Sequence, residues 1–278
     1  MTEAQDATAW VPPVGPLGEL TRRSADQARL TAEMPGALAV LRARAEAAPA
    51  PPGFAAALRG GAVSVIAELK RRSPSKGVIN DGLQANLRAV EYARGGAAAL
   101  SVLTEPTRFG GSLDDLAEVS AAVAIPLLRK DFISSTIQLL EARAVGASAV
   151  LLIARALPSE RLHSLAAEAY ALGLECLVEV RSESELITAL AVPEAVIGVN
   201  NRDLETLVID DAIGLRLLAR IPADRVAVYE SGVRGVLEVE RAAEAGADAV
   251  LVGSILSAAG DGAAAVRALS EVRRRGRS

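Results

Sequence analysis

Cysteine and histidine are almost absent from this chain, which has one of each, Cys176 and His163, among 278 residues. A single cysteine excludes an intrachain disulfide. Zinc sites take several cysteine or histidine ligands, so ordinary zinc chemistry is excluded too, and we expect neither a metal nor a cofactor. His163 lies between apolar positions of a helical repeat, which favours a surface or packing role, and Cys176 lies in an apolar run, which favours a packing role. Proton transfer must therefore fall to lysine and glutamate.

Long apolar runs and excess positive charge are lacking as well. No stretch reaches the roughly 18 consecutive apolar residues that a membrane-spanning helix needs. The net charge is −4 and the basic segments are short, which argues against binding to nucleic acid. The amino terminus lacks the basic start and apolar core of a secretory signal. We therefore expect a cytoplasmic protein whose partner is a small molecule.

Apolar residues, by contrast, are plentiful, at 51% of the chain, which is enough for one large core. Residues 1–50 have no strand pattern, and within them residues 17–44 have helical spacing. A proline-rich run at 49–53 separates this part from the rest. The sequence predicts a helical amino-terminal arm over residues 1–50, packed on a single catalytic domain over residues 51–278.

Eight short β-rich runs follow, and most are continuous rather than alternating, as expected for strands that are covered on both faces. Stretches with helical spacing separate them, and this alternation is typical of a parallel sheet. The predicted strands cover residues 63–69, 99–103, 126–128, 149–153, 175–178, 196–199, 226–229 and 249–252. The predicted helices cover residues 83–94, 113–122, 138–144, 160–172, 183–190, 213–219, 236–245 and 262–273.

Three similar joints support this reading. Gly96, Gly146 and Gly246 are each followed by small residues and then by a strand, and glycine readily adopts the left-handed conformation that ends a helix. Eight such units predict a closed (β/α)8 TIM barrel, with a doubly wound open sheet as the alternative. In a barrel the active groups gather at the carboxyl ends of the strands.

Charged and polar residues occur where the predicted strands end. Desolvation of a charge beside apolar strands costs free energy unless the charge is paired or does chemistry, so a cluster drawn from six strands is hard to explain as surface decoration. The cluster comprises Glu68, Lys70, Lys130, Asp131, Glu179, Asn200, Asn201, Arg202, Glu230, Ser231, Gly253 and Ser254.

Two of these strand ends indicate a phosphate site. Ser231 and Gly232 follow the seventh predicted strand, Gly253 and Ser254 follow the eighth, and backbone N–H groups in such turns bind anions. Ordinary tight-turn geometry accounts for either turn alone, but both together in a barrel favour a phosphorylated substrate. The basic loop 70–76 has no interleaved aromatic residues, so we interpret it as a mobile active-site loop that contacts phosphate rather than as a nucleic-acid patch.

Six segments, in this order, resemble the indole-3-glycerol-phosphate synthase family: AELKRRSPS at 67–75, LRKDF at 128–132, LVEV at 177–180, GVNNRDL at 198–204, ESG at 230–232 and LVGS at 251–254. The similarity extends over about residues 50–257. It implies a (β/α)8 carboxy-lyase that converts 1-(2-carboxyphenylamino)-1-deoxyribulose 5-phosphate to indole-3-glycerol phosphate, with release of CO2 and water, in tryptophan biosynthesis.

The resemblance also implies catalytic roles. Lys130 would be the general acid for ring closure, and Lys70 would pair with the substrate and serve as the acid in dehydration. Glu179 would be the leading base, a role that Glu68 would share or replace. Spacing does not decide which carboxylate takes which proton.

Substrate contacts follow from the same resemblance. Asn200 and Arg202 would orient the anthranilate part and its carboxylate, since a planar guanidinium matches a carboxylate with two hydrogen bonds. Glu230 would hold this network together. The phosphate would be bound by Ser73, Ser231, Gly232, Gly253 and Ser254.

The chain departs from the family pattern in the residues after Ser254, which we interpret as packing variation, and at two further places. Residues 133–137, after Phe132, keep only part of it, which predicts an altered helix start beside an unaltered lysine. Residues before 50 resemble the family poorly, although the family's amino-terminal segment helps to cover the substrate.

Three other functions fit part of the sequence pattern. An isomerase barrel acting on phosphoribosylanthranilate would share the two glycine turns but would not need Lys70, Lys130 and Glu179 together. A non-catalytic paralogue would be expected to have lost some of the charged residues, and none is missing here. The same chemistry in a specialised indole pathway stays open, and we expect a monomer or a weak homo-oligomer.

Overall fold

Eight parallel strands close into a barrel in this structure, a computed structural model that describes residues 11–277. Strand β1 pairs with β4 on one side and β10 on the other, so the ring has no free edge and the open-sheet alternative is excluded. The strands are β1 (Ser64–Leu69), β4 (Ala99–Leu103), β5 (Leu127–Lys130), β6 (Ala149–Ile153), β7 (Glu175–Val180), β8 (Val196–Asn200), β9 (Ala227–Glu230) and β10 (Ala249–Val252).

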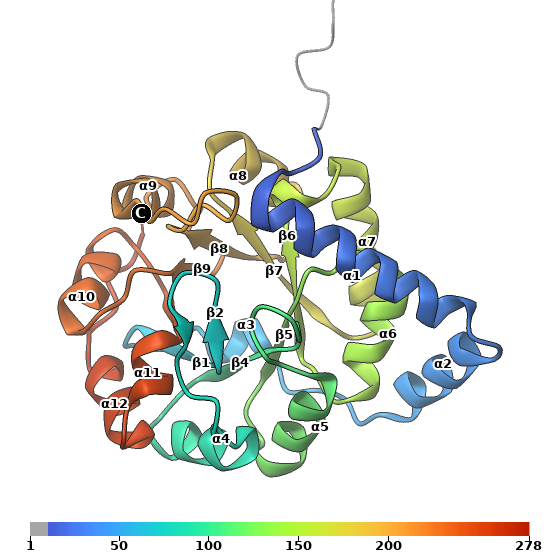
Figure 1. Ribbon diagram of the computed structural model, residues 1–278. Coiled ribbons are helices and arrows are strands. Elements are labelled where there is room, and N and C mark those ends of the chain that lie inside the picture. The colour runs from blue at the N-terminus through green and yellow to red at the C-terminus, as the bar shows by residue number, and fades with distance from the viewer. Residues whose placement is uncertain (1–10, 278) are drawn as a thin grey trace, which may run out of the picture.

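Helices form a ring outside the strands (Figure 1). Each predicted strand and helix is present, with bounds that differ by a few residues. Strand β5, the third barrel strand in chain order, extends two residues beyond the predicted end and stops at Lys130. The helices are α4 (Ala85–Arg94), α5 (Leu113–Ala122), α6 (Thr136–Ala144), α7 (Ser159–Ala171), α8 (Glu183–Leu190), α9 (Asp211–Leu218), α10 (Val236–Glu244), α11 (Ser254–Ala258) and α12 (Gly262–Ser270), with a 3-10 turn η1 (Ala154–Ala156).

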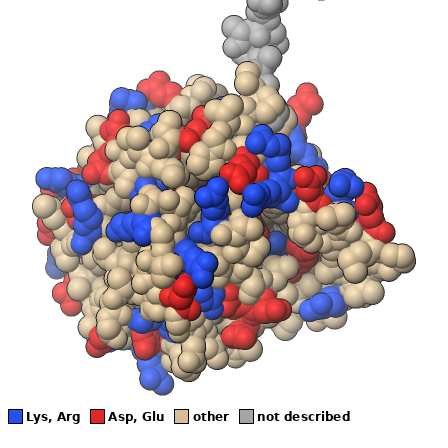
Figure 2. All heavy atoms as spheres, in the orientation of Figure 1, with Lys and Arg blue, Asp and Glu red and all other residues tan. Residues whose placement is uncertain are grey.

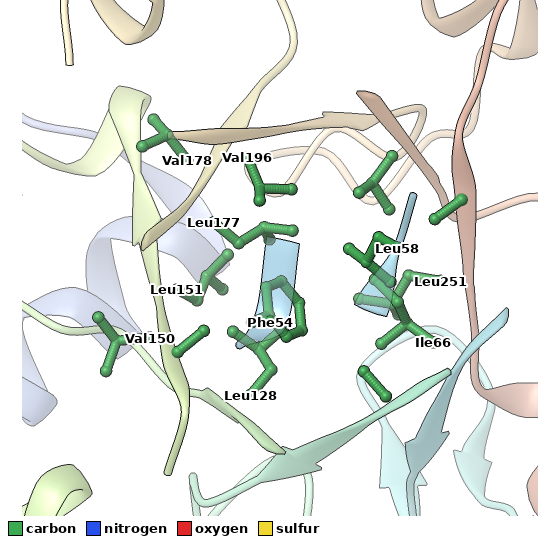
Figure 3. Packing of buried hydrophobic residues seen from close by; sticks show 14 of the residues in the cluster. Phe54, Leu58, Ile66, Leu128, Val150, Leu151, Leu177, Val178, Val196 and Leu251 are labelled. Atoms are coloured by element: carbon green, nitrogen blue, oxygen red, sulfur yellow. The ribbon is translucent and has the colours of Figure 1, made fainter. Parts of the chain in front are cut away.

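A short helix, α3 (Phe54–Ala57), closes the end of the barrel where the strands begin. Phe54 and Leu58 are fully buried and point among Leu128, Leu177 and other interior side chains (Figure 3). The Glu175 carboxylate at the start of β7 accepts hydrogen bonds from the backbone N–H groups of Phe54, at 2.7 Å, and of the next residue, at 2.8 Å. These bonds satisfy the free donors of the helix start. The barrel interior is therefore apolar at this end, and its polar residues are concentrated at the other.

The amino-terminal segment forms two helices where the sequence predicts one helical stretch over 17–44. They are α1 (Gly15–Glu33) and α2 (Ala37–Ala47). Pro35 and Gly36 break the stretch, and Gly36 adopts a left-handed φ of 77° that favours glycine. Helix α1 lies across the rim near β6 and α6 (Figure 1). The first ten residues of the expected arm lie outside the described residues, and the boundary at residue 50 stays a prediction.

Two expectations about isolated residues are confirmed. Cys176 is 1% exposed, and burial raises the pKa of its thiol to about 12, as expected for a packed, unreactive side chain. His163 lies on α7 and its ring nitrogen is 3.2 Å from the Thr188 carbonyl oxygen, away from the barrel mouth. Within residues 11–277, no helix combines the length and the apolar character needed to cross a bilayer.

The plug at the base of the barrel makes a stability prediction. Phe54→Ala removes a fully buried aromatic ring and leaves a cavity in the core. We therefore expect the free energy of unfolding to fall by about 3–5 kcal/mol. Urea unfolding followed by circular dichroism measures this. Leu237→Ala, at a position that is 55% exposed on α10, is the matched control and should change stability little. Equal effects of the two substitutions would contradict the plug.

Candidate active site

A cavity of about 420 Å³ opens at the carboxyl ends of the strands, a size usual for small-molecule sites. Basic side chains gather near the centre of the face in Figure 2, although the chain as a whole is acidic. All but two of the predicted site residues line the cavity. Glu230 lies against Lys130, and the fully buried Asn201 donates to the backbone carbonyl oxygens of Glu230 and Ser231. The lining set comprises Glu68, Lys70, Ser73, Lys130, Asp131, Glu179, Asn200, Arg202, Ser231, Gly232, Gly253 and Ser254.

The Lys130 ammonium is at the centre of the cavity floor. Its Nζ is 3.0 Å from Glu230 Oε2 and 3.4 Å from Glu68 Oε2. Burial acts to lower the pKa of Lys130, but the negative charges of Glu230, Glu68 and Glu179 outweigh it and raise that pKa above its usual range. Lys130 therefore carries its proton throughout the neutral range and is equipped to donate it.

Glu68 joins the two lysines of the floor. Its Oε1 is 2.5 Å from Lys70 Nζ, while its other oxygen faces Lys130. Glu68 is 1% exposed, and burial acts to raise the pKa of its carboxyl, but the two ammonium groups outweigh burial and lower it. Glu68 is therefore an ionised carboxylate at neutral pH, a better partner for cations than a proton carrier.

Glu179 has the opposite character. Burial, together with the adjacent negative charge of Glu230, raises the pKa of Glu179 to about 8, although Lys130 and the Asn200 amide act against the shift. One oxygen of Glu230 is buried without a donor from any described residue, and a proton on Glu179 supplies one. A carboxyl that gains and loses its proton near neutral pH suits acid–base catalysis.

Two glycines make room for the buried carboxylates. A Cβ at Gly198 in β8 would lie 2.0 Å from Glu230 Oε1, and a Cβ at Gly253 would lie 2.3 Å from Glu68 Oε1. Neither position tolerates a larger residue without moving a charged side chain. The sequence analysis assigns Gly198 no role, although glycine inside a strand often marks such a close approach and is a signal for it.

The turn after β9 has the backbone geometry expected of an anion site. Ser231 and Gly232 have positive φ values of 62° and 86°, and this conformation turns successive N–H groups toward one side. Gly253, Ser254 and the 8% exposed Ser73 line the same cavity, and Ser73 Oγ accepts a hydrogen bond from the Lys76 backbone. The turns after β9 and β10 thus face one space, as predicted.

The basic loop after β1 differs in part from expectation. It contains a small hairpin, β2 (Arg72–Ser73) with β3 (Gly77–Val78). The guanidinium of Arg71 forms two hydrogen bonds of 2.7 Å with Asp115, and Arg72 pairs with Asp81. Lys70, Ser73 and Lys76 line the cavity, but the two arginines do not.

Several cavity residues were not anticipated. Pro16, Leu17 and Leu20 of α1 form part of the wall, so the amino-terminal segment borders the site directly. Phe109 and Phe132, with ring centroids 6.4 Å apart, add an aromatic wall. Lys76 lines the cavity too, so all three lysines of the chain, Lys70, Lys76 and Lys130, face one space. The scarcity of lysine in the sequence is a signal for Lys76.

A buried network behind β5 fixes the strand end that carries Lys130. Arg129 is 3% exposed and its guanidinium donates to the Gln138 carbonyl oxygen and contacts Glu141 and Asp131. Gln138 and Ser135 form a capping box at the start of α6, so the altered segment 133–137 still starts the helix in an orderly way. As expected, the departure from the family pattern leaves Lys130 in place.

Arg202 closes the side of the cavity near β8. Its guanidinium donates to the Leu207 carbonyl oxygen at 2.9 Å, and burial lowers the pKa of Arg202. It forms no ion pair with any carboxylate in the described part of the chain, so a cation faces the cavity without a protein counter-charge.

Within residues 11–277, no cluster of three or more His, Cys, Asp or Glu side chains is arranged to hold a metal ion.

Fold and cavity together define a (β/α)8 barrel with an acid–base site at the carboxyl ends of its strands. Solved structures agree on the fold: the chain superposes on a 3-hexulose-6-phosphate synthase from Salmonella typhimurium (TM-score 0.60, 15% identity, 75% of this chain and 97% of that one). It also superposes on a thiamine phosphate pyrophosphorylase from Pyrococcus furiosus (TM-score 0.55, 17% identity, 76% and 95%). At these identities the likeness concerns the fold alone.

Sequence comparison gives the family. The family model described as indole-3-glycerol phosphate synthase matches residues 20–269, so the similarity begins within the amino-terminal arm and not, as the motifs indicate, near residue 50. Indole-3-glycerol phosphate synthase 2 of Streptomyces coelicolor is 50% identical over 80% of this chain and 87% of its own. A synthase of Nocardioides sp. is 52% identical over 77% and 82%. The chain belongs to the indole-3-glycerol phosphate synthase family.

The close approach at Gly253 gives a prediction for the site. Gly253→Ala places a methyl group against Glu68 and must displace it from Lys70, so we expect catalytic turnover to fall by roughly 10-fold or more, on the scale of a lost charge-assisted contact of about 1.5–3 kcal/mol. Steady-state kinetics with the substrate named below measure this. Gly61→Ala, where an added Cβ meets nothing within 4 Å, is the control. Normal turnover in Gly253→Ala would show that Glu68 is not constrained as described.

Proposed function

We propose that the protein is an indole-3-glycerol-phosphate synthase, a carboxy-lyase that converts 1-(2-carboxyphenylamino)-1-deoxyribulose 5-phosphate to indole-3-glycerol phosphate, CO2 and water. The observation that carries this proposal is the convergence of Lys70, Lys130, Glu68, Glu179 and Glu230 in and directly against one cavity from four different strand ends. The reaction needs an acid for each of two steps and a base for one, and this set supplies them.

Ring closure is assigned to Lys130. The aromatic carbon that bears the carboxylate attacks the ribulose carbonyl, and the developing alkoxide needs a proton. Lys130 is charged, held between two carboxylates and directed into the cavity, so it acts as the general acid. Loss of CO2 then leaves the electron pair in the ring and restores aromaticity.

Dehydration is assigned to Lys70 and Glu179. The hydroxyl formed by ring closure leaves as water, with a proton from Lys70, while a base removes a proton from the carbon next to nitrogen. Glu179 is the leading base because its carboxyl titrates near neutral pH, whereas Glu68 is tied to both lysines. Glu68 then serves mainly to place the two ammonium groups.

Substrate binding uses the walls of the cavity. Arg202, which has no carboxylate partner within residues 11–277, binds the anthranilate carboxylate, and Asn200, whose Oδ1 accepts from the Arg202 backbone, orients it. The phosphate is bound by the turns after β9 and β10 and by Ser73. The apolar residues of α1 and the aromatic wall enclose the ring system.

The setting proposed is tryptophan biosynthesis in the cytoplasm, by a monomer or a weak homo-oligomer. The same chemistry in a specialised indole pathway is a second candidate for the setting. A non-catalytic paralogue is disfavoured because no charged group of the expected set is missing and the cations and anions are paired within the cavity.

The activity is tested by incubating purified protein with the substrate and following indole absorbance or fluorescence. We expect product with the wild-type protein and its loss in Lys130→Met, which removes the acid while keeping much of the side-chain volume. Binding of a product analogue should be largely retained in the variant. No product from the wild-type protein would favour the non-catalytic reading, and near-normal rates in Lys130→Met would refute the role of that lysine.

The raised pKa of Glu179 makes a pH prediction. A base must be unprotonated to act, and this carboxyl holds its proton up to a pKa of about 8, so kcat/KM should rise with pH and level off above about 8. Because Glu179 and Glu230 interact, the value belongs to the pair. Glu179→Gln should remove this limb along with most of the activity. A profile that is flat from pH 6 to 9 would rule out Glu179 as the base.

A further inference from the structure

A second, smaller cavity of about 120 Å³ adjoins the main one on the side of β7 and β8. Glu179, Asn200 and Arg202 line both cavities, so the same catalytic carboxyl borders two spaces. One water molecule needs on the order of 15 Å³ of cavity volume, so the side cavity has room for several.

The walls of the side cavity are mixed. Leu17, Ile153, Val180 and Leu204 are apolar, and the other lining side chains are polar. Arg181 is 3.6 Å from Asp203, Arg155 is 2.9 Å from Glu205, and these four side chains keep between 24% and 32% of their surface exposed. The cavity therefore extends from buried residues, Glu179 among them, to charged groups that solvent reaches. Its titratable groups besides Glu179 are Arg155, Arg181, Glu185, Arg202, Asp203 and Glu205.

The proposed reaction consumes a proton. The ribulose carbonyl oxygen gains two protons and departs as water, while one proton is lost from the carbon next to nitrogen. The carboxylate departs as neutral CO2, which leaves its electron pair in the ring. One proton per turnover must therefore come from solvent, and the bound substrate then fills the main cavity, between Glu179 and its mouth.

A continuous set of polar groups leads from the side cavity to the acid. Glu179 borders the side cavity, and its register partner in β8 is Gly198, against which Glu230 Oε1 packs. The negative charge of Glu230 acts on Glu179 and raises its pKa, as expected for neighbouring carboxyls. Glu230 Oε2 is 3.0 Å from Lys130 Nζ, and Glu68 links Lys130 to Lys70. A proton taken up at Glu179 can pass through Glu230 to Lys130 without crossing the bound substrate.

We propose that the side cavity is a water-filled proton route, through which Glu179 exchanges protons with solvent and reloads Lys130 while substrate or product occupies the main cavity. This proposal rests on the proposed function. In this proposal Arg181, Ser182 and Glu185 line the entry of water to Glu179 and do not contact the substrate.

Ser182, which lines only the side cavity, allows the route to be closed in the folded protein. Ser182→Cys is labelled with benzyl methanethiosulfonate, and dithiothreitol removes the label. The native Cys176 is 1% exposed and its pKa is raised to about 12, so it does not compete for the reagent. We expect the benzyl label to slow steady-state turnover several-fold and to enlarge its solvent deuterium isotope effect, with substrate affinity unchanged and the rate restored by reduction.

Two controls separate blockage from damage. Ser182 Oγ accepts a hydrogen bond from the Glu185 N–H at the start of α8, and Ser182→Ala loses this cap while leaving the cavity open, so it should keep the wild-type rate and isotope effect. Wild-type protein exposed to the reagent should be unaffected. Fully labelled Ser182→Cys with an unchanged rate and isotope effect, or with weakened substrate binding alone, would overturn the route. An inactive wild-type protein would instead remove the proposed function on which it rests.

Discussion

The ammonium of Lys130, desolvated among carboxylates, is the interaction on which the rest of the site depends. A buried cation without partners would cost several kcal/mol and would shed its proton. Here Glu230 and Glu68 lie within 3.4 Å, so the cation is kept and remains ready to donate. The same arrangement leaves Glu230 beside Glu179, and like charges so close keep one proton between them. One cluster thus yields a permanent acid and a carboxyl that titrates near neutral pH.

The barrel supplies this cluster by geometry. Parallel strands bring their carboxyl ends to one rim, so residues separated by more than 150 positions, such as Glu68 and Glu230, lie side by side. Glycines at 198 and 253 leave space for the carboxylates, and the apolar plug of α3 closes the opposite end. Stability and reactivity are therefore divided between the two ends of one structure, and changes at the rim act mainly on charge placement.

Much of this follows from the sequence because it depends on local pattern. Continuous apolar strands ending in Glu, Lys or Asn predict the barrel and its rim, and small-residue joints after Gly96, Gly146 and Gly246 predict where helices end. Pairing between side chains far apart in the chain is not encoded locally. The ion pair of Arg71 with Asp115 and the place of Leu17 in the cavity wall depend on packing between distant segments, so the sequence pattern does not predict them. The break at Gly36 differs from these two, because the local dipeptide Pro35-Gly36 signals it. The catalytic roles and the boundary at residue 50 stay predictions.

The charge state of Lys130 is the most direct test of this account. The chain has only three lysines, so 13C-lysine labelling gives a spectrum in which Lys130 is assigned by its absence from Lys130→Met. The account predicts that the Lys130 side-chain signal stays at its charged position through and beyond pH 10.5, the ordinary value for lysine, because its carboxylate partners raise the pKa. Titration of that signal below pH 10 would contradict it, since the ammonium would then gain nothing from Glu68 and Glu230.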